Sequence, residues 1–273
     1  MLTLTVEEAQ SLKQFTENHY AQAAFFWTYL LKNKEIKVNG RKVCSDVALS
    51  AGDEVSYFLT SKQQGKKAFS IAYQDELVLV ADKESGVNSE AVYEAIKRER
   101  EIYFIHRLDR NTQGLLLFAK TPTCADALLK AFKERKIEKI YHALCVGRLN
   151  APAQTLTAYL KKDEKTATVK IFDRPQDGAD KIITEYKTLW DKQGISKLEI
   201  RLHTGKTHQI RAHFAHIGNP VLGDMKYGDK EVNKRLNRTR QCLVAKSLTL
   251  SLPDFPTLDK KTFLSSFNAE LTE

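Results

Sequence analysis

Short strand-like segments dominate this chain, and they restrict its fold more than any other feature of the sequence. Six runs rich in β-branched, aromatic and aliphatic residues predict strands, at 76–82, 114–120, 139–147, 184–190, 197–203 and 248–252. Helical spacing of apolar residues predicts three helices between them, at 89–100, 123–135 and 207–217. Strands outnumber helices and the two do not alternate regularly. This order favours an α+β fold with a large, mostly antiparallel mixed sheet and flanking helices.

The first sixty residues predict a separate small α/β unit. Apolar residues at 7–34 recur mostly every three or four positions, which indicates helix. Asn39-Gly40 lies between two short β-branched runs in 36–43 and is a strong hairpin signal. A further turn and strand follow at 49–59. We therefore expect two helices followed by a small sheet.

A polar, basic stretch at 61–70 has almost no large apolar residues and is typical of a linker. We therefore divide the chain into a domain at 1–60, a linker at 61–70 and a second domain at 71–273.

The net charge of +9 favours a polyanionic partner, most simply nucleic acid, although solubility alone would also explain it. Part of the charge lies on the predicted hairpin, as Lys37, Arg41 and Lys42. These side chains could bind phosphates or form an ordinary solvated surface.

The four cysteines show neither metal-ligand spacing nor a disulfide pattern, which is typical of a reducing compartment. The N-terminus has no signal-peptide pattern, and the apolar run at 23–31 is too short to cross a bilayer. We expect a cytoplasmic protein without a membrane anchor.

The stretch HRLDRNTQGLLLFAK, residues 106–120, places Asp109 between Arg107 and Arg110, on a loop that leads into a strand. A carboxylate in that position suits a functional site. An Asp that closes a turn by bonding to the backbone is an equally ordinary interpretation.

A second cluster, HTGKTHQIRAHFAHIGNPVLGDMKYG, occupies residues 203–228. The glycine that a phosphate-binding P-loop requires is missing, and the histidine spacing fits no common metal site. A helix over 207–217 would bury Ile210 and Phe214 and leave Arg211 beside them, with Gly218 as its left-handed cap. A partly buried arginine needs an anion, and Asp109 is a candidate. Contact with phosphate or surface packing would also account for Arg211.

The third cluster, KIYHA at 139–143, lies in a predicted strand. Alternation puts Lys139 and Tyr141 on one face. A tyrosine beside a lysine can stack on a nucleic-acid base, although an ordinary half-buried strand tyrosine is the simpler interpretation.

Taken together, these motifs resemble those of RluA-type pseudouridine synthases. The family pattern H-R-L-D-x-x-T-x-G-L-L-x-x-A-K is similar to 106–120, K-x-Y-x-A to 139–143, and G-[KR]-x-H-Q-I-R-x-H followed by L-G-D-x-x-Y-G to 205–228. The resemblance covers roughly 70–255. The sequences Val38-Asn39-Gly40 and Gly52-Asp53-x-Val55 resemble the S-four-like (alpha-L) RNA-binding domain. Departures at Asn111–Gln113, Lys83–Gly86 and Val244-Ala245 affect the subfamily and target rather than the reaction.

The resemblance implies isomerisation of uridine in RNA, without metal or other cofactor. It implies a catalytic set of Asp109, Tyr141 and Arg211, with Arg211 gripping the Asp109 carboxylate. Tyr141 would pack on a flipped base, Arg107 would fill the vacated stack, and Leu243 would lie beneath the uracil. RNA contacts are further expected from Arg110, Lys139, Lys206, His208 and Gln209, and from the hairpin residues Lys37, Arg41 and Lys42.

Ribosomal RNA of the large subunit is the favoured substrate and transfer RNA the second, for a monomeric enzyme. Whether Asp109 attacks the sugar or abstracts a proton to give a glycal stays open. A non-enzymatic RNA-binding or ribosome-assembly factor is the main alternative. A glycosidase-like hydrolase would usually need two opposed carboxylates.

Overall fold

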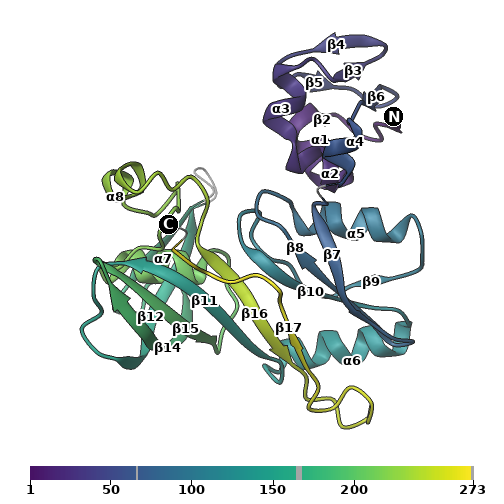
Figure 1. Ribbon diagram of the computed structural model, residues 1–273. Helices are drawn as coiled ribbons and strands as arrows, with labels where there is room; N and C mark the ends of the chain where they lie inside the picture. Colours follow the sequence, from purple (N-terminus) through teal and green to yellow (C-terminus); the bar gives the residue numbers. More distant parts are fainter. Residues whose placement is uncertain (66, 164–167, 272–273) are drawn as a thin grey trace.

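The computed structural model describes residues 1–65, 67–163 and 168–271 (Figure 1). The N-terminal part of the chain forms a four-stranded antiparallel sheet with short helices. The strand order is β1-β6-β3-β4, and β2 and β5 make a separate pair. The elements are β1 Leu2–Thr5, β2 Gln10–Ser11, α1 Leu12–His19, α2 Ala21–Phe25, α3 Trp27–Lys32, β3 Ile36–Val38, β4 Arg41–Val43, β5 Ala48–Leu49 and β6 Glu54–Tyr57.

Three helices occupy the segment where we expected two. The Ser11 side chain accepts from the backbone N–H of Gln14 at 3.2 Å and caps α1, so the helix begins at residue 12 instead of 7. Tyr20, with φ −140°, and Phe26 interrupt the helical pattern. The prediction also missed β1, which pairs with β6 ahead of the helices. The hairpin is confirmed: Asn39 and Gly40 have φ of 49° and 78°, the positive values of a two-residue turn.

Parts of the segment 61–70, which we expect to be a linker, have regular secondary structure. Helix α4 spans Ser61–Gly65, and residues 69 and 70 already belong to the next strand. The Gln22 side chain donates to the carbonyl of Gln63 at 2.6 Å and accepts from the N–H of Ala68 at 2.9 Å. These bonds tie Gln63 and Ala68 to helix α2.

Within the described residues, eleven strands build the large sheet, in the order β13-β12-β14-β15-β11-β16-β10-β8-β7, with β9 beside β10 and β17 beside β16. Neighbours are antiparallel except β10 and β16, so the predicted fold class is confirmed. The strands are β7 Phe69–Gln74, β8 Val78–Lys83, β9 Tyr103–Phe104, β10 Gln113–Ala119, β11 Glu138–Val146, β12 Ala153–Asp163, β13 Thr168–Phe172, β14 Asp180–Lys192, β15 Ile195–Leu202, β16 Leu243–Thr249 and β17 Thr262–Leu264.

Helices cover both faces of one half of this sheet (Figure 1). Helix α6 (Pro122–Lys133) packs on alternate residues of β8 and β10, including Val80 and Leu117, and α5 (Ser89–Lys97) packs on the other set, including Leu79 and Leu116. Alternation along a strand sends successive side chains to opposite faces, which is why these strands are apolar throughout.

Helix α7 (Gln209–His216) packs its residues Ile210 and Phe214 on the other half of the sheet, over β11, β14 and β15. Gly218 follows with φ 83°, the left-handed conformation expected after this helix. Helix α8 spans Lys230–Arg235. None of the helices in the described ranges has the length and apolar character needed to cross a bilayer.

Candidate active site

The loop that carries Asp109, between β9 and β10, is held by hydrogen bonds just before the aspartate. The Ser89 hydroxyl donates to the Leu108 carbonyl at 3.1 Å and accepts from the Leu108 N–H at 2.9 Å. His106 accepts the N–H of Leu117 through Nε2 at 3.1 Å, and burial lowers the pKa of His106 to about 4. This first histidine of the motif is therefore a neutral structural residue that ties the loop to β10.

Lys83 forms side-chain hydrogen bonds that hold the same loop in place. Its side chain is fully buried, and Nζ donates to the carbonyls of Glu84, Val87 and Arg110 at 2.8–3.0 Å. Burial lowers the pKa of Lys83 to about 7, although the charge of Asp109 acts in the opposite direction. Sequence reasoning noted the turn that starts at Lys83 but missed its contact with the Asp109 loop.

Arg211 holds Asp109, as expected, and also a second carboxylate that the prediction missed. Its Nη1 donates to Oδ2 of Asp109 at 3.0 Å. Its Nε and Nη2 form a two-pronged contact with Asp224, at 2.7 and 3.1 Å. Burial raises the pKa of Asp224, but the hydrogen bonds and charge of Arg211 outweigh it, so the pKa lies below its ordinary value. Asp224 therefore orients the fork that grips Asp109.

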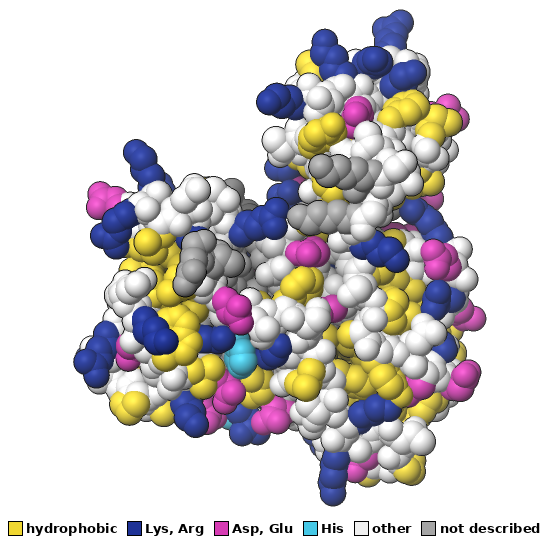
Figure 2. Space-filling view, in the orientation of Figure 1, with side chains coloured by type: hydrophobic (Ala, Val, Ile, Leu, Met, Phe, Trp, Pro, Cys, Tyr) yellow, Lys and Arg dark blue, Asp and Glu magenta, His cyan; other side chains and the backbone are white. Residues whose placement is uncertain are grey.

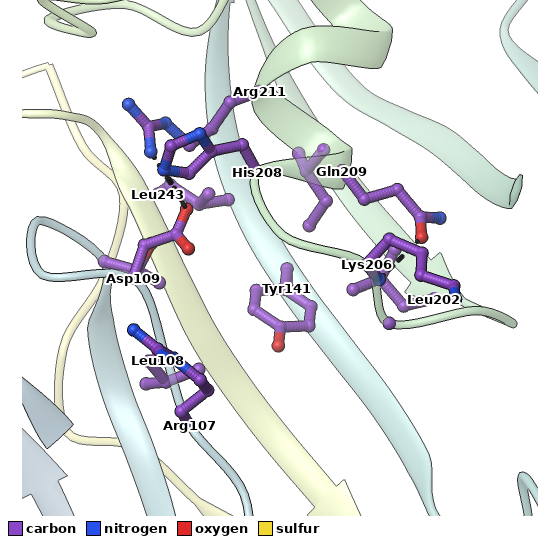
Figure 3. Close-up of a pocket in the computed structure, with 13 residues that line it drawn as sticks. Arg107, Leu108, Asp109, Tyr141, Leu202, Lys206, His208, Gln209, Arg211 and Leu243 are labelled. Atoms are coloured by element: carbon purple, nitrogen blue, oxygen red, sulfur yellow. Dashed lines mark hydrogen bonds and ion pairs between the residues drawn. The ribbon is translucent and has the colours of Figure 1, made fainter. Parts of the chain in front are cut away.

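His208 lines this end of the pocket (Figure 3), and Tyr227 contacts it from outside the lining. Nε2 of His208 lies 4.0 Å from Oδ2 of Asp109, and Nδ1 lies 2.9 Å from the Tyr227 hydroxyl. The Tyr227 ring packs over the guanidinium of Arg211, with 5.2 Å between Cζ and the ring centroid. Burial lowers the pKa of His208, against the raising effect of Asp109, and so favours a neutral imidazole.

Asp109, His208 and Arg211 line a pocket with about 460 Å³ of empty space, a figure that includes its opening to solvent. Tyr141 packs against two apolar clusters, one around β8 and β10 and the other around β11 and β15. Leu243 is only 3 % exposed and forms part of the pocket wall (Figure 3). The lining residues are Arg107, Leu108, Asp109, Thr112, Tyr141, Leu202, Gly205, Lys206, His208, Gln209, Ile210, Arg211 and Leu243.

A wider groove shares Arg107, Tyr141 and Lys206 with the pocket and continues past Lys139. It adds Lys133 and Arg135, which sequence reasoning did not select. Their only signal was a run of basic residues at the end of a predicted helix. Such a basic groove suits a phosphodiester backbone.

Two residues expected to contact RNA have other partners. The Gln209 amide is saturated inside the protein: it donates to the Ile183 carbonyl and to Thr184, and accepts from Thr204 and the Lys206 N–H. Gln209 therefore has a structural role in the protein, and its expected contact with RNA stays a prediction.

Arg110 does not line the pocket. It donates to the Gly86 carbonyl at 3.2 Å and pairs with Glu17 of α1 at 3.1 Å, so it links the N-terminal unit to the Asp109 loop.

The basic hairpin lies at the free end of the N-terminal unit, away from the pocket. Strands β3 and β4 form this end in Figure 1, and Figure 2 shows Lys and Arg side chains gathered there. Arg41 and Lys42 are exposed, and Lys37 lies over the ring of Phe58 at 5.1 Å. The hairpin therefore does not contribute to the pocket itself.

Comparison with known proteins gives consistent matches. The model of the RNA pseudouridylate synthase family matches residues 57–216. An "Uncharacterized RNA pseudouridine synthase" of Chlorobaculum parvum is 29% identical over 246 residues, which cover 80% of this chain and 73% of that protein. The "Ribosomal large subunit pseudouridine synthase C" of Rickettsia conorii is 29% identical, over 74% of this chain and 76% of that protein.

Among solved structures, the human RNA pseudouridylate synthase domain containing 1 aligns with a TM-score of 0.58 and 25% identity, over 73% of this chain and 91% of that one. The fold and these similarities define an isomerase that acts on RNA. Because the family model covers more than half of the chain, the chain belongs to the RNA pseudouridylate synthase family.

Proposed function

We propose that the chain converts uridine to pseudouridine in large-subunit ribosomal RNA, with Asp109 as the catalytic carboxylate. The observation that carries the proposal is the 3.0 Å contact between Asp109 and a buried arginine inside an open pocket. The Asp109 side chain keeps 22% of its surface exposed, whereas Arg211 keeps 7%. The buried Arg211 thus fixes the Asp109 carboxylate, while part of the carboxylate stays accessible from the pocket.

The two carboxylate oxygens of Asp109 have different surroundings. Arg211 and His208 both lie nearest to Oδ2 of Asp109. Oδ1 is then the oxygen for chemistry, either by attack on the anomeric carbon of the uridine or by removal of a sugar proton to give a glycal. Both routes need an ionised carboxylate at a fixed angle. The hydrogen bond from the Arg211 guanidinium fixes that angle.

The target nucleotide must leave its RNA helix to enter a pocket of this kind. Tyr141 offers a ring to the everted base, and Leu243 an apolar surface beneath it. Arg107 lines the pocket, is exposed and forms a 3.5 Å ion pair with Glu90, and it would fill the gap in the stack. Base stacking on an aromatic residue contributes about 1–3 kcal/mol.

The substrate assignment rests on the names of relatives and on charge. The relatives from Rickettsia conorii and Vibrio cholerae are both named "Ribosomal large subunit pseudouridine synthase C". The groove with Lys133, Arg135 and Lys139 would bind the backbone beside the pocket, and the basic hairpin would add a distant, S-four-like RNA contact. We further propose a monomeric, cytoplasmic enzyme, with transfer RNA as the second substrate candidate.

Tritium release from RNA labelled at uracil carbon five tests the reaction. We expect release by the wild type, none above background by Asp109→Asn, and wild-type release by Asp126→Asn, which alters an exposed acid on α6. RNA binding without release by the wild type would instead support an assembly factor. Mapping pseudouridines in ribosomal and transfer RNA of a deletion strain would identify the substrate.

A further inference from the structure

The Tyr227 hydroxyl lies between two nitrogen atoms, and this position determines what it can donate. The backbone N–H of Val169 donates to the hydroxyl oxygen at 2.9 Å. Nδ1 of His208 lies 2.9 Å away from the same oxygen. The Val169 N–H donates to the hydroxyl oxygen and cannot accept its proton. The Tyr227 hydroxyl therefore donates its proton to Nδ1 of His208, which acts as the acceptor.

This hydrogen bond sets the tautomer of His208. In a neutral imidazole, one nitrogen accepts and the other carries the proton. With Nδ1 accepting from Tyr227, the proton is on Nε2, on the side of the ring that faces Asp109 (Figure 3). At 4.0 Å, Nε2 is too far from Oδ2 for a hydrogen bond, so the N–H can reach an acceptor oxygen of a nucleotide in the pocket.

The backbone supports the same orientation. His208 has φ 54°, a left-handed conformation that is uncommon for a residue other than glycine, and it immediately precedes α7. Such strain persists where the surroundings hold it and often marks a functional position. Here the contact with Tyr227 holds the side chain.

We propose that Tyr227 is a positioning residue: it fixes the Nε2–H tautomer of His208, and that N–H donates to an oxygen of the uridine held against Asp109. The inference rests on the proposed function of Asp109 as the catalytic carboxylate. Tyr227 itself contacts Arg211 and His208 rather than the reacting atoms.

Long-range ¹H–¹⁵N spectra of the imidazole test the tautomer without any turnover. We expect the proton on Nε2 in the wild type and a shift toward Nδ1 in Tyr227→Phe, which keeps the ring over Arg211. His208→Asn assigns the signal by removing it. A wild-type proton on Nδ1, or an unchanged spectrum in Tyr227→Phe, would overturn the inference.

Turnover tests the coupling between the two residues. Tyr227→Phe should lower kcat/KM about 10-fold, the effect of one hydrogen bond of ordinary strength. Asn tolerates a left-handed backbone, so His208→Asn is a suitable second background. In that background Tyr227→Phe should change kcat/KM by less than about 2-fold, because the contact is already gone.

Recurrence of the full loss in the His208→Asn background would mean that Tyr227 acts by another route, such as its bond to Val169, and would refute the proposal. Tyr186→Phe, which removes a hydroxyl that donates to the Ala151 carbonyl, is the matched control and should retain wild-type kcat/KM. A failure of the proposed function would look different: the wild type itself would release no tritium in an Asp109-dependent manner.

Discussion

Replacing Arg211 by Gln should reverse the way stability responds to pH. In the wild type one guanidinium is shared by two carboxylates, Asp109 and the fully buried Asp224. Gln removes the positive charge and leaves the buried Asp224 carboxylate with the backbone N–H donors of Lys226 and Tyr227 but without its guanidinium partner.

The magnitude follows from the burial of the pair. Removing one partner of a buried ion pair typically costs about 3–5 kcal/mol, out of a total stability of about 5–15 kcal/mol. Without Arg211, burial is the dominant influence, and the pKa of Asp224 should rise above its unfolded value. A carboxyl with a raised folded-state pKa binds its proton more readily in the native state, so the variant gains stability as pH falls.

The wild type should behave differently between pH 7.5 and 5.5. Its Asp224 pKa is lowered, so the stability that this group contributes is lost only at more acid pH, below the unfolded pKa of about 3.9. The deficit of the variant should therefore be smaller at pH 5.5 than at pH 7.5.

Urea denaturation of both proteins at the two pH values measures this. Arg201→Gln is the control, because it removes a surface pair with Glu138 and should cost under about 1 kcal/mol at either pH. A deficit below about 1 kcal/mol for Arg211→Gln, or one that is equal at both pH values, would refute the reasoning.

Three further outcomes follow from the geometry. Tyr141→Phe should bind RNA like the wild type, whereas Tyr141→Ala should lose about 1–3 kcal/mol of binding in filter assays; equal losses would argue against stacking. Gly114→Ala should lower the urea midpoint strongly, because Gly114 has φ 113° and a Cβ would lie 2.3 Å from the Ala245 carbonyl oxygen; a midpoint near that of the wild type would contradict this. Lys42→Ala should reduce the salt dependence of RNA binding by about one counterion and leave kcat unchanged; a loss of kcat would instead place the hairpin at the site.

The fold class and the Asp109–Arg211 contact could be predicted, because apolar pattern and motif carry them. The existence of Asp224 as a second partner could not. The L-G-D-x-x-Y-G motif displayed the residue, but spacing along a turn does not give the direction of its side chain. Strand β1 was missed for a related reason: four residues have little pattern of their own, and pairing with β6 makes them a strand.

Gln209 shows that a motif does not reveal the internal partners of its residues. It lies within a motif rich in functional residues, and proximity in sequence suggested contact with RNA. Its amide instead joins the start of α7 to β14, through Ile183 and Thr184. A sequence motif can mark a residue as important without showing which group it forms hydrogen bonds with.

The parallel pairing of β10 with β16 has a consequence for how the enzyme is made. Asp109 precedes β10, Arg211 lies 102 residues later, and the strand that joins their two halves comes later still. Contacts this distant in sequence form slowly. On a translating ribosome, Asp109 would therefore emerge well before Arg211 and β16, so the pocket would be completed late in synthesis.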